Sequence, residues 1–217
     1  MRQSADYLEL IEPPGTTRDR IVTEALKLFS EKGYRGTRVG DIEAAAGLSP
    51  RSGALYSHFA SKEEVFAAAL DRVDAAVDAA VRLFEMSSVE DLRSELTLLG
   101  RGMFLAAGMW DRVIGIMLKE AEQFPELVGQ ARARVLDRAH VWLADWLRRQ
   151  VASRRLVDHD QDAVAAIAIG SLLYHHLLAT RFGGPPSEVE QDRFVAAWVD
   201  LIGRLATPKS KRRGGSR

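Results

Sequence analysis

The sequence contains no cysteine among its 217 residues. This absence excludes disulfide bonds, thiolate metal ligands and cysteine nucleophiles, and it is typical of a protein kept in a reducing cytoplasm. Prolines are also few, 7 in all, and they fall between segments with helical periodicity. No segment shows the apolar–polar alternation of β-branched residues that marks a strand. These absences favour an all-α, cytoplasmic protein.

Segments that direct a chain to a membrane are missing as well. Residues 1–15 have no basic start followed by an apolar run, so we expect no secretory signal. The longest apolar stretch, 163–179, is short for a membrane span and is interrupted by Ser171, His175 and His176. We therefore expect a buried or interface helix there and no membrane partner.

Sequence patterns that are typical of catalysis do not occur. The chain has no G-x-S-x-G, no phosphate-binding G-x-x-x-x-G-K and no H-E-x-x-H. Carboxylates and histidines are present, but nothing in their spacing arranges them for a reaction. We expect no enzymatic activity, no cofactor and no metal ion.

The chain has no net charge, because 30 basic residues balance 30 acidic ones. The two kinds of charge are unevenly distributed along the chain, however. Residues 32–62 hold five basic and two acidic side chains. Residues 207–217 hold five basic side chains and no acidic one, and we expect this tail to be disordered. Because phosphates respond to local charge, a neutral total does not exclude binding to nucleic acid.

Helical periodicity predicts a series of helices. The first covers 17–32, and Gly33 can end it with a left-handed backbone conformation. Ser61 and Glu64 have the spacing of a capping box, and they begin a helix of about twenty residues or more that links two lobes. Further helices are expected at 90–108, 111–122, 126–152, 160–182 and 188–205.

Between the first and the long helix, a short helix, a turn and a second short helix form a helix-turn-helix pattern. Thr37 is expected to cap the earlier short helix. Ser49 and Pro50 are expected to start the later one, which enters the DNA major groove. Gly53 lies in its middle, where no side chain holds the backbone away from DNA. The expected DNA contacts are Thr37, Arg38, Pro50, Arg51, Ser52, Gly53, Tyr56, Ser57, His58 and Lys62.

The segment "ALKLFSEKGYRGTRVGDIEAAAGLSPRSGALYSHFASKEEVFAAAL" resembles the N-terminal domain of the tetracycline-repressor (TetR/AcrR-type) family of bacterial transcription regulators. The residues that carry the resemblance are Ala25, Leu28, Phe29, Gly33, Tyr34, Thr37, Asp41, Ile42, Ala46, Gly47, Ser49, Leu55, Tyr56, Phe59, Ser61 and Lys62. The segment "AEQFPEL" is similar to one found in many members. The resemblance implies a three-helix DNA-binding domain followed by a helical ligand-binding and dimerisation domain.

The chain departs from the family pattern at one place. Five residues separate Ser49 from the Leu55–Tyr56 pair, two more than in the family. Two interpretations follow: the recognition helix starts earlier, or the turn before it is longer. Which of Arg51, Ser52 and Gly53 meets a base depends on the choice.

The resemblance divides the chain into four parts. We expect a flexible segment (1–15), a helix-turn-helix domain (16–62), a helical ligand-binding and dimerisation domain (63–206) and a disordered basic tail (207–217). Family members dimerise through their last two helices, which implies an interface with Ala165, Ile169, Leu172, Leu173, Leu177, Val195, Trp198 and Ile202. An intramolecular core is the alternative for these residues. Pockets are mostly apolar with a few polar groups, and candidates for lining one are Phe104, Met109, Trp110, Met117, Trp142, Trp146, Tyr174 and His175.

Together these features predict a homodimeric repressor that binds a palindromic operator in double-stranded DNA. A small, largely apolar effector, whose identity the sequence does not reveal, would release it. Two alternatives remain open: a constitutive DNA-binding regulator without a ligand, and a helical enzyme or binding protein with a vestigial DNA-binding domain. A two-fold dimer would place its recognition elements on half-sites roughly 34–36 Å apart.

Overall fold

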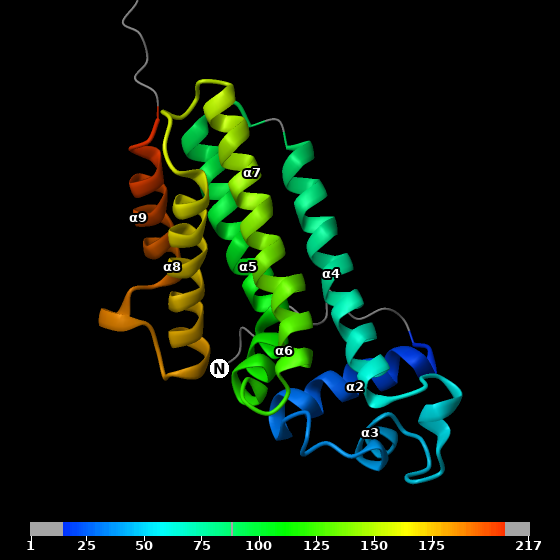
Figure 1. Cartoon of the computed structure of the whole chain (residues 1–217). Coiled ribbons are helices and arrows are strands. Elements are labelled where there is room, and N and C mark those ends of the chain that lie inside the picture. The colour runs from blue at the N-terminus through cyan, green and yellow to red at the C-terminus, as the bar shows by residue number, and fades with distance from the viewer. Residues whose placement is uncertain (1–14, 88, 207–217) are drawn as a thin grey trace, which may run out of the picture.

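The computed structural model describes residues 15–87 and 89–206 (Figure 1). The expected basic tail and all but Gly15 of the expected flexible segment lie outside these residues. The α-helices are α2 (Thr17–Lys32), α3 (Val39–Ala45), α4 (Lys62–Met86), α5 (Leu92–Glu120), α6 (Pro125–Arg132), α7 (Arg138–Ala152), α8 (Gln161–Arg181) and α9 (Gln191–Gly203). Shorter helical segments are η1 (Ala54–Ser57), η2 (Ala133–Asp137, a π-helix) and η3 (Pro186–Glu188). The described residues contain no strand beyond one isolated bridge, so the all-α prediction is confirmed.

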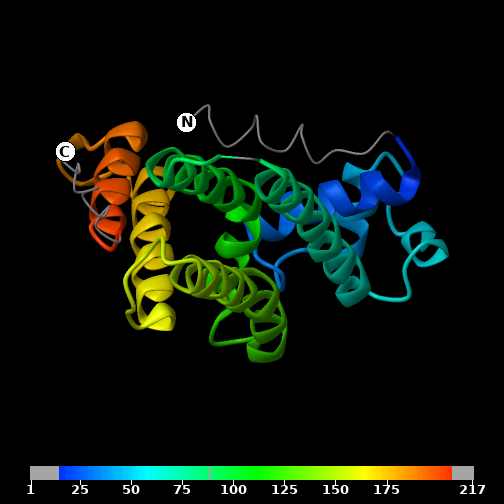
Figure 2. The same ribbon diagram turned by 90° about the horizontal axis from the view of Figure 1, so that it is seen from above.

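The helices form two regions. Figure 1 shows α2, α3 and the segment around η1 at one end of the molecule, with α4 rising from them beside the long helices α5 and α7. Helices α8 and α9 lie on the side away from α4, both in this view and from above (Figure 2).

Local sequence signals account for the start and end of α2. The hydroxyl of Thr16 accepts a hydrogen bond from the Asp19 amide at 3.1 Å and so caps the helix. The helix ends at Gly33, where φ is +81°. A Cβ atom at Gly33 would lie 2.6 Å from Oε1 of Glu120. Glycine therefore permits both the chain reversal and the close approach of α5.

The long connecting helix α4 also begins as predicted. Ser61 accepts a hydrogen bond from the Glu64 amide at 3.2 Å, and the Glu64 carboxylate accepts one from the Ala60 amide at 2.5 Å. The helix then runs for 25 residues. On one side it carries Asp71, Asp74 and Asp78, which pair with arginines of η2 and α7. These pairs tie the connecting helix to the rest of the C-terminal region.

Two hydrophobic clusters hold the chain together. The first contains the inward side chains of α2, α3, η1 and α4 together with Val113, Ile116 and other residues of α5. It therefore continues across residue 62, where we placed the boundary between domains. The second joins the N-terminal half of α5 to α7, α8 and α9.

Three predicted helix boundaries are wrong. The break at Trp110 does not exist, because α5 runs without interruption from Leu92 to Glu120 and buries Trp110. The helix predicted at 126–152 is divided by the π-helical turn η2. The last helix begins at Gln191 rather than residue 188, because Ser187 and Glu188 have positive φ.

Helix α8 is the one helix within the described residues that is long and apolar enough to cross a membrane, and 28% of its apolar stretch is buried. It packs against α7 and α5. Much of its apolar surface is therefore exposed in the single chain.

Candidate nucleic-acid interface

The segment predicted to start a recognition helix is a turn. Ser52 donates from its amide (3.3 Å) and its hydroxyl (2.7 Å) to the carbonyl of Ser49, and the Ala54 amide donates to the Ser52 hydroxyl at 3.2 Å. Regular structure begins only with the 3₁₀ turn η1. The prediction that Ser49 and Pro50 begin a helix is therefore wrong, and the longer turn is the correct interpretation of the two extra residues.

Backbone conformation explains why this segment does not become a helix. Arg51 has φ +61° and Gly53 has φ +75°, both in the left-handed region. A Cβ atom on Gly53 would contact only Tyr56 Cδ2, at 3.8 Å. The structural reason for Gly53 is consequently its positive φ, and not the lack of space for a side chain.

Most of the predicted DNA contacts lie at the surface of this end of the molecule. Tyr56, for example, is 58% exposed, whereas Leu55 and Phe59 face the core. Of the predicted residues, Arg38, Pro50, Arg51, Ser52, Tyr56 and Ser57 are exposed, Gly53, His58 and Lys62 are half-buried, and Thr37 is buried.

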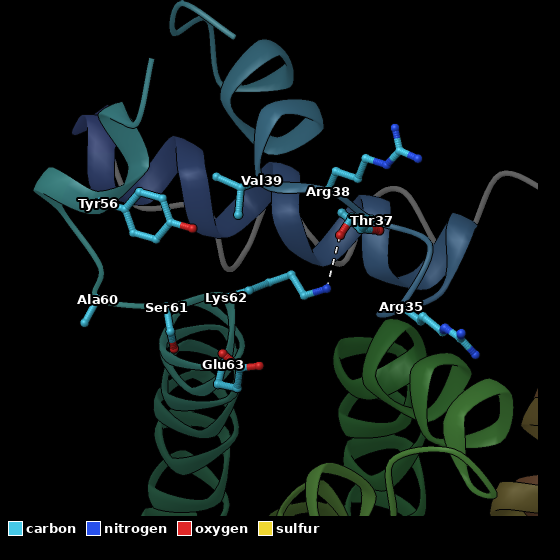
Figure 3. A pocket seen from close by; sticks show the side chains of 9 residues that line it. All are labelled: Arg35, Thr37, Arg38, Val39, Tyr56, Ala60, Ser61, Lys62 and Glu63. Carbon is cyan, nitrogen blue, oxygen red and sulfur yellow. Dashed lines mark hydrogen bonds between the residues drawn. The ribbon is translucent and has the colours of Figure 1, made fainter. Parts of the chain in front are cut away.

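A hollow of about 450 Å³ opens between α3, η1 and the start of α4 (Figure 3). It is lined by Arg35, Thr37, Arg38, Val39, Tyr56, Ala60, Ser61, Lys62 and Glu63. Three of these side chains are basic and one is acidic. A concave, basic surface beside the amide end of a long helix is suited to a phosphate group.

Thr37 does not cap α3 and its hydroxyl is not available to DNA. The residue is 1% exposed, and its hydroxyl donates to the Gly33 carbonyl at 2.8 Å. The residue at the cap position is Arg38, whose amide donates to the Asp41 carboxylate at 3.2 Å. The prediction that Thr37 caps α3 is therefore wrong, because its side chain bonds the end of α2 instead.

Lys62, the first residue of α4, bonds this helix to the loop before α3. Its ammonium donates to the carbonyls of Tyr34 (2.8 Å) and Thr37 (3.1 Å) and lies 4.1 Å from the centre of the Tyr34 ring. Burial lowers the pKa of Lys62, and the carboxylates of Glu63 and Glu120 act in the opposite direction. Figure 3 shows this ammonium at the edge of the hollow, directed at Thr37, and its contact with a phosphate stays a prediction.

We predict that Lys62→Met weakens binding to specific and random DNA equally. The slope of log affinity against log salt should fall by about one, because one phosphate contact is lost. Fluorescence anisotropy at several salt concentrations measures both quantities, below the melting temperature of the variant. Lys27→Met is the control, because Lys27 pairs with Glu24 at 2.7 Å on α2. An unchanged slope in Lys62→Met would show that the ammonium serves only the two carbonyls.

Five residues of the hollow were not among the predicted DNA contacts, namely Arg35, Val39, Ala60, Ser61 and Glu63. Arg35 belongs to the basic segment 32–62, and the local charge of that segment was the sequence signal that could have identified it as a DNA contact. Its guanidinium also donates to Gln123 at 3.1 Å, so it lies where the helix-turn-helix region meets the loop after α5. The other residues carry no chemical signal and are brought together only by folding.

The eight predicted ligand-binding residues are divided between the two hydrophobic clusters and the surface. Met109, Trp110 and Met117 belong to the first hydrophobic cluster, and Phe104, Trp142 and Trp146 to the second. His175 is buried, but its Nε2 atom bonds the Val189 carbonyl at 2.7 Å. Tyr174 is 58% exposed in the single chain, and its role in binding a ligand stays a prediction. Within the described residues, no group of acidic and histidine side chains is placed to hold a metal ion.

The predicted dimer residues mostly serve the core of their own chain. Ala165, Leu172, Val195, Trp198 and Ile202 are all at most 6% exposed. Ile169, Leu173 and Leu177 are half-buried and pack against the two clusters. The face assigned to a partner is thus the inner face, because α8 and α9 use it to pack against α5 and α7.

Two family models match the sequence. The model described as "Bacterial regulatory proteins, tetR family" matches residues 21–69, and the model described as "AefR-like transcriptional repressor, C-terminal domain" matches residues 103–205. The first match contains the hollow and the turn, and the second contains most of the C-terminal helices.

Individual proteins agree with these matches. The HTH-type transcriptional regulator TcmR of Streptomyces glaucescens is 32% identical over 67% of this chain and 63% of TcmR. The negative regulator of the biofilm operon icaADBC, IcaR of Staphylococcus epidermidis, is 43% identical over 23% of this chain and 25% of IcaR. The crystal structure of the TetR-family regulator PfmR of Thermus thermophilus superposes with a TM-score of 0.56 at 30% identity, over 85% of this chain and 97% of PfmR. The chain thus spans less than two thirds of the length of TcmR.

Proposed function

The chain belongs to the tetR family of bacterial regulatory proteins, and on that premise we propose that it is a cytoplasmic, dimeric DNA-binding repressor that a small ligand releases. The observation that carries this proposal is the position of the exposed turn around Arg51 beside the basic hollow. The hollow receives a backbone phosphate, and the turn then faces base edges in the major groove. Phosphate contacts position such a protein, and base contacts specify its site.

A second copy of the chain is the partner that fits the outer face of α8 and α9. Ile167 and Tyr174 lie seven residues apart on α8, which is two helical turns, and they are 63% and 58% exposed. Gly170 lies between them without a side chain, and Leu201 of α9 is 59% exposed. An apolar stripe with a small residue at its centre permits a close helix–helix contact. These exposed residues are different from the interface residues predicted from the sequence, which lie mainly on the inner face.

Release by a ligand requires that the ligand binds one arrangement of the dimer better than another. The loss of DNA affinity then equals the difference between its affinities for the two arrangements. Two connections join the C-terminal helices to the DNA-binding end. One is α4. The other is the end of α5, where Lys119 donates to carbonyls of α2 and Glu120 accepts from the Tyr34 amide at 2.6 Å. Movement of α5 therefore reaches α2 directly.

Footprinting on the DNA upstream of its own gene tests this proposal. We expect a protected palindrome at moderate salt, and loss of protection with some members of a library of apolar compounds. Protection that no compound removes would favour a constitutive regulator. No protection would favour the third hypothesis, a helical enzyme or binding protein with a vestigial DNA-binding domain.

Arg51→Ala is predicted to weaken binding to the operator by about 1–3 kcal/mol, with little effect on random DNA, because a base contact contributes only at the correct sequence. Titration of both duplexes by anisotropy measures the two affinities. Arg82→Ala removes an exposed arginine of α4, outside the hollow and the turn, and should change neither affinity. Equal losses on both duplexes in Arg51→Ala would make Arg51 a phosphate contact.

A further inference from the structure

Glu43 is a buried carboxylate beneath the exposed turn. It lies on α3 and is 0% exposed. Its Oε2 atom accepts a hydrogen bond from the Arg51 amide at 2.7 Å, and its Oε1 atom accepts one from the Leu55 amide at 3.1 Å. Its backbone carbonyl also accepts from the Leu48 amide at 2.8 Å. One residue thus holds the turn at three points.

The two amides that the carboxylate binds lie on either side of the left-handed residues of the turn. Arg51 itself has φ +61°, which is sparsely populated by residues other than glycine. Such a conformation persists only where surrounding contacts hold it. Charge-assisted hydrogen bonds from amides to a carboxylate are among the stronger ones. The Glu43 carboxylate therefore holds the turn in this conformation from below, together with the hydrogen bonds of Ser52 within the turn.

A second contact fixes the direction of the Arg51 side chain. A Cβ atom on Gly40 would lie 3.3 Å from Arg51 Cγ, so the arginine stem rests on the first turn of α3 at a residue without a side chain. Glu43 holds the Arg51 backbone, and Gly40 provides the surface under its side chain. Both contacts come from α3.

We propose that Glu43 is a positioning residue that determines which bases this protein selects. It acts through the turn, by fixing where Arg51 and Ser52 stand relative to the hollow that receives the phosphate. Glu43 does not touch DNA in this account. The inference rests on the proposed DNA-binding function, and it adds the group that sets sequence preference.

The test compares base preference, affinity for random DNA and thermal stability in the full-length protein. Glu43→Gln keeps the shape of the side chain but replaces one acceptor oxygen with a donor, so one of the two amides loses its partner. Each variant is titrated against the operator, every single-base substitution of it, and a random duplex. We expect Glu43→Gln to lower the ratio of specific to random affinity by about fivefold or more, as expected for one misplaced base contact, with unchanged affinity for random DNA.

Two further variants separate positioning from general stability. Gly40→Ala displaces the Arg51 stem without touching Glu43 and adds a residue that favours helix, so it should fold and alter preference at the same base positions. Asp111→Asn is the control: Asp111 is also a buried carboxylate that accepts hydrogen bonds, but from His176 and Arg181 of α8. Its base preference should equal that of the wild type.

Three outcomes would overturn the inference. One is an unchanged preference profile in Glu43→Gln, and the second is an equal loss on operator and random DNA, which indicates a purely structural role. The third is a wild-type protein without any preferred bases. That third result would overturn the proposed function as well, whereas the first two leave it standing.

Discussion

Leu201→Asp is expected to convert the dimer into a monomer and to lower operator affinity by about 10²–10⁴-fold, because joining two binding modules contributes a factor of that size. Leu201 is an exposed leucine on the outer face of α9. A carboxylate there would have to be desolvated in an apolar interface, which is costly without a cationic partner. Analytical ultracentrifugation gives the oligomeric state, and titration of the palindrome gives the affinity.

The control for this substitution is Leu83→Asp. Leu83 is 70% exposed and belongs to α4, a helix that lies apart from α8 and α9 in Figures 1 and 2. We expect this variant to stay dimeric and to bind the operator normally. If Leu201→Asp also remains a dimer with full affinity, the outer face of α9 is not the interface.

Asp111→Ala is expected to lower the free energy of unfolding by roughly 1–3 kcal/mol, because it removes the carboxylate to which the buried His176 and the half-buried Arg181 donate hydrogen bonds. The Asp111 carboxylate accepts hydrogen bonds from His176 at 3.1 Å and from Arg181 at 2.7 Å, and Thr180 lies at 3.3 Å. Gly115 makes this network possible, because a Cβ atom there would lie 2.7 Å from the Arg181 guanidinium. Urea unfolding followed by circular dichroism measures the loss.

The same network predicts how stability depends on pH. Burial raises the pKa of Asp111, but the hydrogen bond from His176 and the charge of Arg181 outweigh it, so the pKa is lowered. A lowered folded-state pKa stabilises the protein above the unfolded value of about 3.9, and this stabilisation is lost as the pH falls through the folded-state pKa. As the pH falls below about 4, the free energy of unfolding should therefore decrease less in Asp111→Asn than in the wild type. Equal acid sensitivity would show that other carboxylates control this range.

Sequence analysis succeeded where the determining signal is local. Gly33 and the Ser61–Glu64 pair fix helix ends through contacts within a few residues, and both were predicted correctly. It failed at Ser49 and Pro50, which have the residue types of a helix start. There the conformation depends on Glu43, which is buried on another helix. The periodicity of the sequence does not reveal the contacts of its side chain. The break predicted at Trp110 failed for a related reason, since packing against the first cluster continues α5 through that position.

The two faces of α8 show a second limit. This helix is apolar on every side, so hydropathy identifies it as a packed helix without saying which side packs inward. Leu172 and Ala168 face the core of their own chain, whereas Ile167 and Tyr174 face outward. Only the positions of α5, α7 and α9 decide between these faces. The predicted interface residues are consequently mainly on the inner side of α8 and α9, and the outer face is the one left exposed in the single chain.

The central claim is that this chain is a dimer that recognises a defined DNA sequence. Selection of duplexes from a fully randomised pool by the purified protein, followed by sequencing, tests it most directly. We expect enrichment of a palindrome whose half-sites lie about one helical turn, or a multiple of it, apart. Binding that enriches no sequence, or no retention of DNA at moderate salt, would contradict it.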